Sequence, residues 1–306
     1  MKRCISILLL VFMIIGGTTA FADEYDPQLV IKPTKEEILA GEEKAADMSR
    51  LVELLGLNDF SLNSRSKGVV EKQYSVKEIA EIAAIAAKYD SETSSYSVMV
   101  GLENQAKSGA KAAASVPTTK NLNFTTVAQE NGNYCGPASA YMVLKKEGHS
   151  YFMYQTQSTL AGSTTSPTRL QTNYYNQTPF GSNWSSTMSS YSNHSYSILW
   201  GDPYDSINRA MILVDSAIGT LALGRGVVYD TVQYSNSTSN RLVGYPASLP
   251  SNVYHYVAGE GYNASNPSAR ICLYVDPNSA RPAAYGHRQI TFRLMCTLIK
   301  DRGLVF

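Results

Sequence analysis

The sequence predicts an α+β fold for the larger, C-terminal part of the chain, preceded by a helical region. First, apolar residues recur at helical spacing before residue 106, which indicates amphipathic helices. Second, a run of good helix formers follows Cys135. Third, segments rich in β-branched and aromatic residues succeed one another after residue 225. A helix followed by consecutive strands is typical of an α+β domain with an antiparallel sheet.

The first 22 residues have the pattern of a secretory signal peptide. Lys2-Arg3 form a basic start, an apolar stretch follows from Ile5 to Ile15, and Ala20-Phe21-Ala22 fits a cleavage site. The apolar stretch is short for a membrane span, so an uncleaved anchor is the less favoured alternative. We therefore expect a secreted protein, extracellular or associated with the cell wall, with no membrane attachment after cleavage.

The mature chain has a balanced charge. Without Lys2 and Arg3 it carries 24 basic residues against 25 acidic ones, which gives no electrostatic basis for binding nucleic acid. The sequence contains no CxxC motif and no cluster of histidines and cysteines, so we expect no metal and no cofactor. The oligomeric state does not follow from the sequence.

Three cysteines remain after the signal: Cys135, Cys272 and Cys296. The number is odd and too small for a disulfide framework. We expect Cys272 and Cys296 to be core residues, with a disulfide between them as the alternative. In either case Cys135 is left as a free thiol, which raises the question of its reactivity.

Residues 23–105 are predicted to form helices. Thr34 with Glu37, and Ser75 with Glu78, have the spacing of capping boxes at two helix starts. This region is interpreted as an inhibitory propeptide or as a region that binds a partner or the cell wall. The small and polar residues 106–120 are interpreted as a linker to a domain that spans residues 121–306.

Within the C-terminal domain, the pattern changes along the chain. Residues 155–200 are rich in Ser, Thr and Asn and have weak periodicity, which predicts surface loops or short exposed strands. Asp202-Pro203 is a suitable start for the next helix. Strands are then predicted in four segments, which are residues 226–234, 253–262, 269–276 and 288–299.

Cys135 is predicted to lie at the N-terminus of a helix. Gly136 and Pro137 suit the first turn, and Lys145, Lys146 and Gly148 suit the last turn and the stop. Free N–H groups and the helix dipole at this end stabilise a thiolate, which is the nucleophilic form of cysteine. A small buried cysteine that starts a helix is the alternative.

His255 and Asp276 are the predicted partners of Cys135. Of the four histidines, His255 alone lies inside an apolar strand. The turn-forming residues 263–268 are centred midway between His255 and Asp276, so an antiparallel hairpin places the two opposite each other. A carboxylate there orients an imidazole and stabilises its charged form. A bulge near Gly259 and Gly261 would change this pairing.

The quoted residues match a known family in their order along the chain. Gln129, "NYCGPASAYMVL" (133–144), "HYVAGEGY" (255–262) and "YVDP" (274–277) resemble the bacterial secreted cysteine peptidases of family thirty-nine. These peptidases are related to the bacteriocin-processing peptidases and have a papain-like fold. The resemblance covers residues 120–300, with residues 155–200 as a long insertion.

The resemblance implies a papain-like cysteine peptidase domain with Cys135 as nucleophile and His255 as general base and acid. Asp276 is implied to orient the histidine. Gln129 is implied to donate to the oxyanion, together with the backbone N–H of Cys135. The expected substrate is a peptide or protein, or a cell-wall peptide.

Other functions are compatible with the same residues. A peptidoglycan endopeptidase and a transglutaminase-like acyltransferase both use a Cys-His-carboxylate set. A non-catalytic secreted binding protein on the same fold is the third alternative, and it requires that the three residues do not assemble. The sequence leaves the substrate open.

Overall fold

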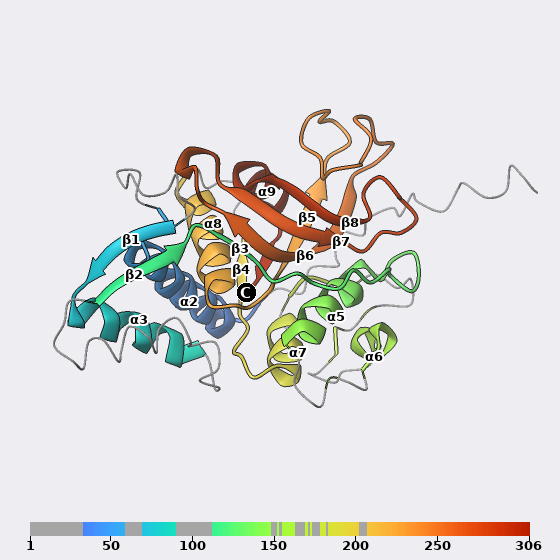
Figure 1. Ribbon diagram of the computed structural model, residues 1–306. Helices are drawn as coiled ribbons and strands as arrows, with labels where there is room; N and C mark the ends of the chain where they lie inside the picture. Colours follow the sequence, from blue (N-terminus) through green and yellow to red (C-terminus); the bar gives the residue numbers. More distant parts are fainter. Residues whose placement is uncertain are drawn as a thin grey trace, which may run out of the picture.

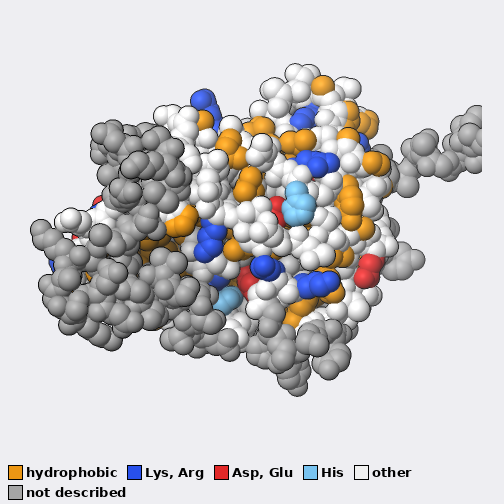
Figure 2. Space-filling view, viewed as in Figure 1, with side chains coloured by type: hydrophobic (Ala, Val, Ile, Leu, Met, Phe, Trp, Pro, Cys, Tyr) orange, Lys and Arg blue, Asp and Glu red, His pale blue; other side chains and the backbone are white. Residues whose placement is uncertain are grey.

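The computed structural model gives an α+β structure in which helices surround an antiparallel sheet (Figure 1). The predicted signal peptide, residues 1–22, lies outside the described residues. The face in Figure 2 has basic and acidic side chains interspersed among neutral and apolar ones. The described residues are 33–58, 69–89, 112–147, 152, 155–162, 169–170, 172, 178–181, 183–201 and 207–306.

The large sheet has seven strands in the described part of the chain. Six follow the order β4-β9-β5-β6-β7-β8, and β3 pairs with β6 beside this path. All of these pairings are antiparallel. The strands are β3 (Thr119–Asn121), β4 (Ile198–Trp200), β5 (Val227–Gln233), β6 (Val253–Asn263), β7 (Ile271–Asp276), β8 (Gly286–Thr291) and β9 (Gly303–Val305).

Five helices in the described residues of the C-terminal part lie around this sheet. In Figure 1, α5, α6 and α7 gather together below the sheet, and α9 lies above it. Helix α5 packs against β6, and α9 packs against β5. The helices are α5 (Cys135–Glu147), α6 (Gln157–Ala161), α7 (Asn183–Tyr191), α8 (Ile207–Ala222) and α9 (Phe292–Ile299), with a short 3-10 turn at Pro267–Ala269.

The described part of the N-terminal region contains two helices and a two-stranded sheet. Thr34 and Glu37 form the predicted capping box at the start of the first helix. Ser75 and Glu78 form the second, since each backbone N–H donates to the other side chain, at 2.8 and 3.2 Å. The elements are α2 (Lys35–Leu54), β1 (Val69–Tyr74), α3 (Val76–Tyr89) and β2 (Ala112–Pro117).

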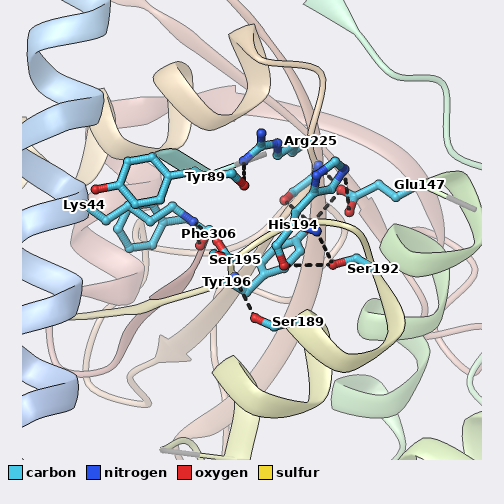
Figure 3. Close-up of polar contacts among 11 residues, drawn as sticks. Lys44, Tyr89, Glu147, Ser189, Ser192, His194, Ser195, Tyr196, Arg225 and Phe306 are labelled. Atoms are coloured by element: carbon cyan, nitrogen blue, oxygen red, sulfur yellow. Dashed lines mark hydrogen bonds and ion pairs between the residues drawn. The ribbon is translucent and has the colours of Figure 1, made fainter. Parts of the chain in front are cut away.

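Helix α2 shares one hydrophobic core with the C-terminal part. It packs along α8, where a Cβ on Gly219 would come within 2.9 Å of the Met48 carbonyl oxygen, so the helices approach closely. The Lys44 ammonium is buried and donates to the carbonyl oxygens of Ser195 and Phe306, each at 2.5 Å (Figure 3). A lysine is rarely buried unless partners compensate it, so this contact ties α2 firmly to residues 195–306.

The prediction that residues 106–120 form a linker is wrong for the described part of this stretch. Residues 112–117 form β2, which pairs antiparallel with β1 from Val69↔Pro117 to Tyr74↔Ala112, and residues 119–121 form β3. The small residues of this stretch have little intrinsic strand preference. Pairing with a neighbouring strand decides their conformation, which a reading of local composition does not capture.

The strand predicted over residues 288–299 is also wrong in its second half. Strand β8 ends at Thr291, whose side chain accepts a hydrogen bond from the backbone N–H of Leu294 at 3.2 Å and so begins α9. Short apolar runs fit both the strand period and the helix period. The spacing of the buried side chains is helical, as shown by Phe292, Met295, Cys296, Leu298 and Ile299.

Residues 155–200 were predicted to be surface loops or short exposed strands. Their described part instead contains α6, α7 and β4. Trp184 and Met188 of α7 are fully buried, so this segment contributes to the core. The segment contains many Ser and Thr residues, so its few large side chains gave too weak a pattern to predict that it packs into the core.

Candidate active site

Cys135 is the first residue of α5, as predicted. The helix begins with the bond from the Ala138 N–H to the Tyr134 carbonyl oxygen, at 2.8 Å. Gly136 and Pro137 are buried in the first turn, and Cys135 is partly exposed as a free thiol. The first N–H groups of a helix have no partner within the helix, and they are directed outward from its N-terminus. The sulfur therefore lies where negative charge is favoured.

His255 and Asp276 meet in the interior of the protein. The His255 Nε2 atom lies 2.9 Å from Asp276 Oδ1, and the two residues are 4% and 0% exposed. Because the carboxylate holds Nε2, the remaining ring nitrogen, Nδ1, is available to Cys135. The pair predicted from the hairpin is thus present.

The register that brings this pair together differs from the predicted one. Beyond the bulge between Gly259 and Gly261, the strands pair as Ala258↔Val275, so the next step places Asp276 opposite Val257. His255 therefore meets Asp276 diagonally, two residues from the expected pairing. A shift of two residues keeps both side chains on the same face of the sheet, whereas a shift of one would separate them.

The imidazole of His255 is held in its charged form. Burial lowers the pKa of His255, but the charge of Asp276, its hydrogen bond and a hydrogen bond with the Cys135 sulfur outweigh burial and raise the pKa to about 10. Near neutral pH the ring is therefore an imidazolium beside Cys135. This cation stabilises a thiolate, which is the competent nucleophile of a cysteine.

The carboxylate of Asp276 is also held by the main chain of the turn that follows it. Its Oδ1 atom also accepts from the Asn278 N–H at 2.8 Å, while Oδ2 is buried with no hydrogen-bond partner in the described part of the chain. The imidazolium is thus its principal counter-charge. Tyr245 packs against His255 with the ring centroids 5.8 Å apart, and its hydroxyl accepts a hydrogen bond from Asn278 Nδ2 at 3.3 Å.

Sequence reasoning missed Tyr245 and Asn278. The turn residues that follow Asp276 could have indicated that a main-chain N–H caps this carboxylate. Tyr245 had no comparable signal, because it comes from an irregular segment between β5 and β6.

Gln129 lies next to the site, but its amide nitrogen is directed into its own loop. The backbone N–H of Gln129 donates to the Pro277 carbonyl oxygen at 3.0 Å, which joins this loop to the residue after Asp276. Its Nε2 atom donates to the carbonyl oxygens of Asn131 and Gly132, at 3.0 and 2.6 Å. Two carbonyl partners fix the orientation of the amide and use both of its hydrogens. The oxyanion role of Gln129 therefore stays a prediction.

The other two described histidines lie in separate environments. His287 Nδ1 lies 2.7 Å from Glu260 Oε1, and His194 Nε2 lies 3.9 Å from Glu147 Oε2. His149 lies outside the described residues. The structure thus pairs His255 alone, among the described histidines, with both a carboxylate and a cysteine.

Cys272 and Cys296 are buried free thiols, so the alternative of a disulfide between them is wrong. Burial raises the pKa of each thiol to about 12. Both are therefore uncharged near neutral pH and poorly reactive. Cys135 differs from them in its exposure and in its histidine partner.

No group of three or more metal-binding side chains occurs among the residues that the structure describes. In the same part of the chain, no helix is both long and apolar enough to cross a membrane.

A cysteine at a helix start, facing a histidine that a buried carboxylate orients, defines a site of the cysteine peptidase type. The α+β arrangement around it agrees with a papain-like fold. The family model described as Peptidase_C39 like family matches residues 121–292, more than half of the chain. The chain belongs to this family. Among curated proteins, none is similar enough to count as a match.

Proposed function

We propose that this protein is a secreted cysteine peptidase that hydrolyses peptide bonds with Cys135, His255 and Asp276. The observation that carries the proposal is the buried bond of 2.9 Å between His255 Nε2 and Asp276 Oδ1, beside the partly exposed thiol of Cys135. This arrangement provides a nucleophile, a proton carrier and a group that orients the carrier.

The proposed reaction begins from the thiolate and the imidazolium. The Cys135 sulfur attacks the carbonyl carbon of the scissile bond, and the carbonyl oxygen takes the negative charge. His255 gives its proton to the leaving amine as the C–N bond breaks, which leaves a thioester on Cys135. Water then attacks the thioester while His255 takes a proton from it, and the carboxylic acid leaves with the thiolate restored.

The oxyanion needs hydrogen-bond donors near the sulfur. The backbone N–H of Cys135 is the first donor in this proposal, since the start of α5 favours negative charge. Gln129 is proposed as the second donor. For this role its amide has to leave the carbonyls of Asn131 and Gly132 when substrate binds.

The proposal is tested by two measurements on the purified mature protein. The first is cleavage of a peptide library and of purified cell wall, compared with Cys135→Ala; cleavage is expected to be lost in the variant. The second is alkylation by iodoacetamide, followed by mass spectrometry. Cys135 is expected to react, whereas Cys272 and Cys296 stay unmodified because they are buried and uncharged.

The result that would overturn the proposal is alkylation of Cys135 no faster than that of a free peptide thiol near neutral pH. Cleavage of cell wall without cleavage of the peptides would restrict the substrate to peptidoglycan. Transfer of a labelled amine to a glutamine substrate would redirect the function to acyl transfer.

The secretion of the protein is proposed from the pattern of residues 1–22. Expression in a bacterial host is expected to yield a protein that begins at Asp23 outside the cytoplasm. N-terminal sequencing of that product tests this, and a full-length product retained in the cells would contradict it.

We also propose that residues 33–58 remain part of the active enzyme rather than leave as a propeptide. The support is the buried Lys44 ammonium, whose removal would take the donor from the Ser195 carbonyl and one of two donors from the Phe306 carbonyl. A protease site inserted within residues 90–111 tests this. After cutting, the fragments are expected to elute together with unchanged activity, whereas release of the N-terminal fragment with a gain of activity would identify a propeptide.

A further inference from the structure

A buried contact joins the neighbours of Cys135 and His255. Residue 136 directly follows Cys135, and residue 256 directly follows His255. Both touch Thr178, which lies in the segment that was predicted to be surface loop. The Tyr256 hydroxyl donates to the Thr178 carbonyl oxygen at 3.1 Å, and Gly136 lies against the Thr178 side chain.

Gly136 lets Thr178 approach the backbone of α5. A Cβ on Gly136 would lie 2.9 to 3.0 Å from three side-chain atoms of Thr178, which is closer than real contacts allow. Thr178 therefore rests on the first turn of the helix that carries Cys135. Its hydroxyl is in turn held by Thr172, with the two oxygens 3.0 Å apart.

Trp184 fixes the other side of the contact. Its ring stacks on Tyr256 with the centroids 4.9 Å apart and the planes 29° apart. Its indole N–H donates to the Pro179 carbonyl oxygen at 3.0 Å, which ties the tryptophan to the residue after Thr178. Trp184, Tyr256 and Thr178 are all buried, so water does not compete for these bonds.

We propose that Tyr256 and Thr178 are positioning residues, which fix the Cys135 sulfur relative to the His255 ring. The inference rests on the proposed function, since it concerns the same sulfur and imidazole. These two groups come from segments 120 residues apart, a helix and a strand. Misplacement by about 1 Å can cost about a hundredfold in rate, so a direct link between the two elements has catalytic value.

Tyr256→Phe is the principal test. It removes the hydroxyl and keeps the ring that stacks on Trp184. The expected result is a fall of about tenfold to a hundredfold in kcat with little change in KM. The rate of Cys135 alkylation at pH 6 is expected to fall as well. At this pH only a thiolate that His255 stabilises reacts fast.

Gly136→Ala tests the same contact from the helix side, because the new methyl group displaces Thr178. It is expected to lower the same alkylation rate, although it leaves the Tyr256 hydroxyl and the neighbouring Asp230 untouched. If Tyr256→Phe does not fold, Gly136→Ala still tests the inference. Thr178→Ser keeps the carbonyl and the hydroxyl, and is expected to retain near-normal rates.

Tyr262→Phe is the matched control. Tyr262 lies on the same strand, is equally buried, and donates to the Pro117 carbonyl oxygen at 3.3 Å, away from the site. Its loss is expected to lower stability without changing the alkylation of Cys135 or kcat. Equal losses in Tyr256→Phe and Tyr262→Phe would overturn the inference, because both effects would then be structural.

The failures of the two proposals are distinguishable. If the wild-type protein alkylates slowly at pH 6, the proposed function fails. If the wild-type protein reacts fast and both Tyr256→Phe and Gly136→Ala react as fast, the positioning inference alone fails.

Discussion

The two ends of α5 place an acidic side chain in opposite surroundings. At the N-terminal end, Cys135 is partly exposed and faces the imidazolium of His255. At the C-terminal end, Glu147 is buried, with the Tyr196 hydroxyl at 2.6 Å and the Gly226 N–H at 2.7 Å from its Oε1 atom (Figure 3). The helix dipole favours an anion at the first end and disfavours one at the second.

The difference shows what each end can do. The sulfur of Cys135 lies beside an imidazolium that can give its proton away, as the proposed reaction requires. Burial raises the pKa of Glu147 to about 7, although Tyr196, Gly226, Arg225 and Lys44 all act to lower it. The Glu147 side chain is 2% exposed and its Oε1 atom accepts two hydrogen bonds, so it contributes to structure. One helix therefore links a reactive end to an anchored end.

Asp276→Ala is expected to have the largest effect, because it removes the counter-charge of the reactive end. Without Asp276, burial lowers the pKa of His255, so the imidazolium is lost near neutral pH. We expect kcat/KM to fall about a thousandfold. In the wild-type protein, activity should persist until the pH approaches 10, and a pH profile of alkylation and cleavage measures both.

Asp215→Asn is the control for this prediction. Asp215 is another buried carboxylate, held by Arg270 at 2.8 Å, and no described contact joins it to Cys135. Its substitution is expected to affect stability and leave the pH profile unchanged. A profile that shifts equally in both variants would remove the special role of Asp276.

Lys44→Met is expected to have the next largest effect, at the anchored end. It removes the donor of the Ser195 carbonyl and one of the two donors of the Phe306 carbonyl, and it removes a positive charge near Glu147. We expect the free energy of unfolding to fall by about 3 kcal/mol or more. Denaturant unfolding followed by fluorescence measures this.

Lys88→Met provides the comparison on the surface. Lys88 pairs with Glu43 and Asp47 at 2.6 and 2.7 Å but is itself largely exposed. Exposed ion pairs contribute about 0–1 kcal/mol. If the two lysine variants lose the same stability, the anchoring role of Lys44 is wrong.

Glu147→Gln is expected to have the smallest effect, and one that depends on pH. The pKa of Glu147 in the folded protein lies above its ordinary value of 4.5, so folding favours the protonated form. Its contribution to stability is therefore fully present below pH 4.5 and is lost as the pH rises through about 7. We expect the wild-type protein to lose on the order of 1–3 kcal/mol in this window that Glu147→Gln does not lose.

His194 faces the same carboxylate, and an imidazole can change its charge in this range. The unfolding series is therefore repeated in His194→Asn, with Lys44 and Arg225 unchanged. A wild-type curve parallel to that of Glu147→Gln between pH 4.5 and 7 would contradict the prediction.

The reactive end could be predicted from the sequence, and the anchored end could not. Strong local signals mark the start of α5, the histidine strand and the strand that ends in Asp276. Their order along the chain resembles that of a known family, which indicated that the three belong to one site. Lys44 and Glu147 have no local signal, because each is explained only by groups distant in sequence. The pairing of β1 with β2 was missed for the same reason. The change from β8 to α9 was missed because a short apolar run fits both the strand period and the helix period.

The His255–Asp276 pair shows how a prediction can find the partners and miss the register. The turn signals located the hairpin, but its bulge and its turn together moved the pairing by two residues. An even displacement preserved the contact. Sequence periodicity indicates which face a side chain occupies, and it determines position along the strand less well.

The bulge in β6 has a further consequence for how this site can change. Glu260, its extra residue, is held by the segment that leads to Cys135, since its carbonyl accepts from Leu122 and its carboxylate from Phe124, at 2.7 and 3.0 Å. Deletion of Glu260 would make the β6–β7 ladder regular and leave Gly259 opposite Tyr274, so His255 would keep its face of the sheet. The segment before Cys135 would instead lose these two hydrogen bonds. Residues 264–270 lie on the other side of the bulge. Insertions or deletions there leave the alternation of side chains along the strand that carries His255 unchanged.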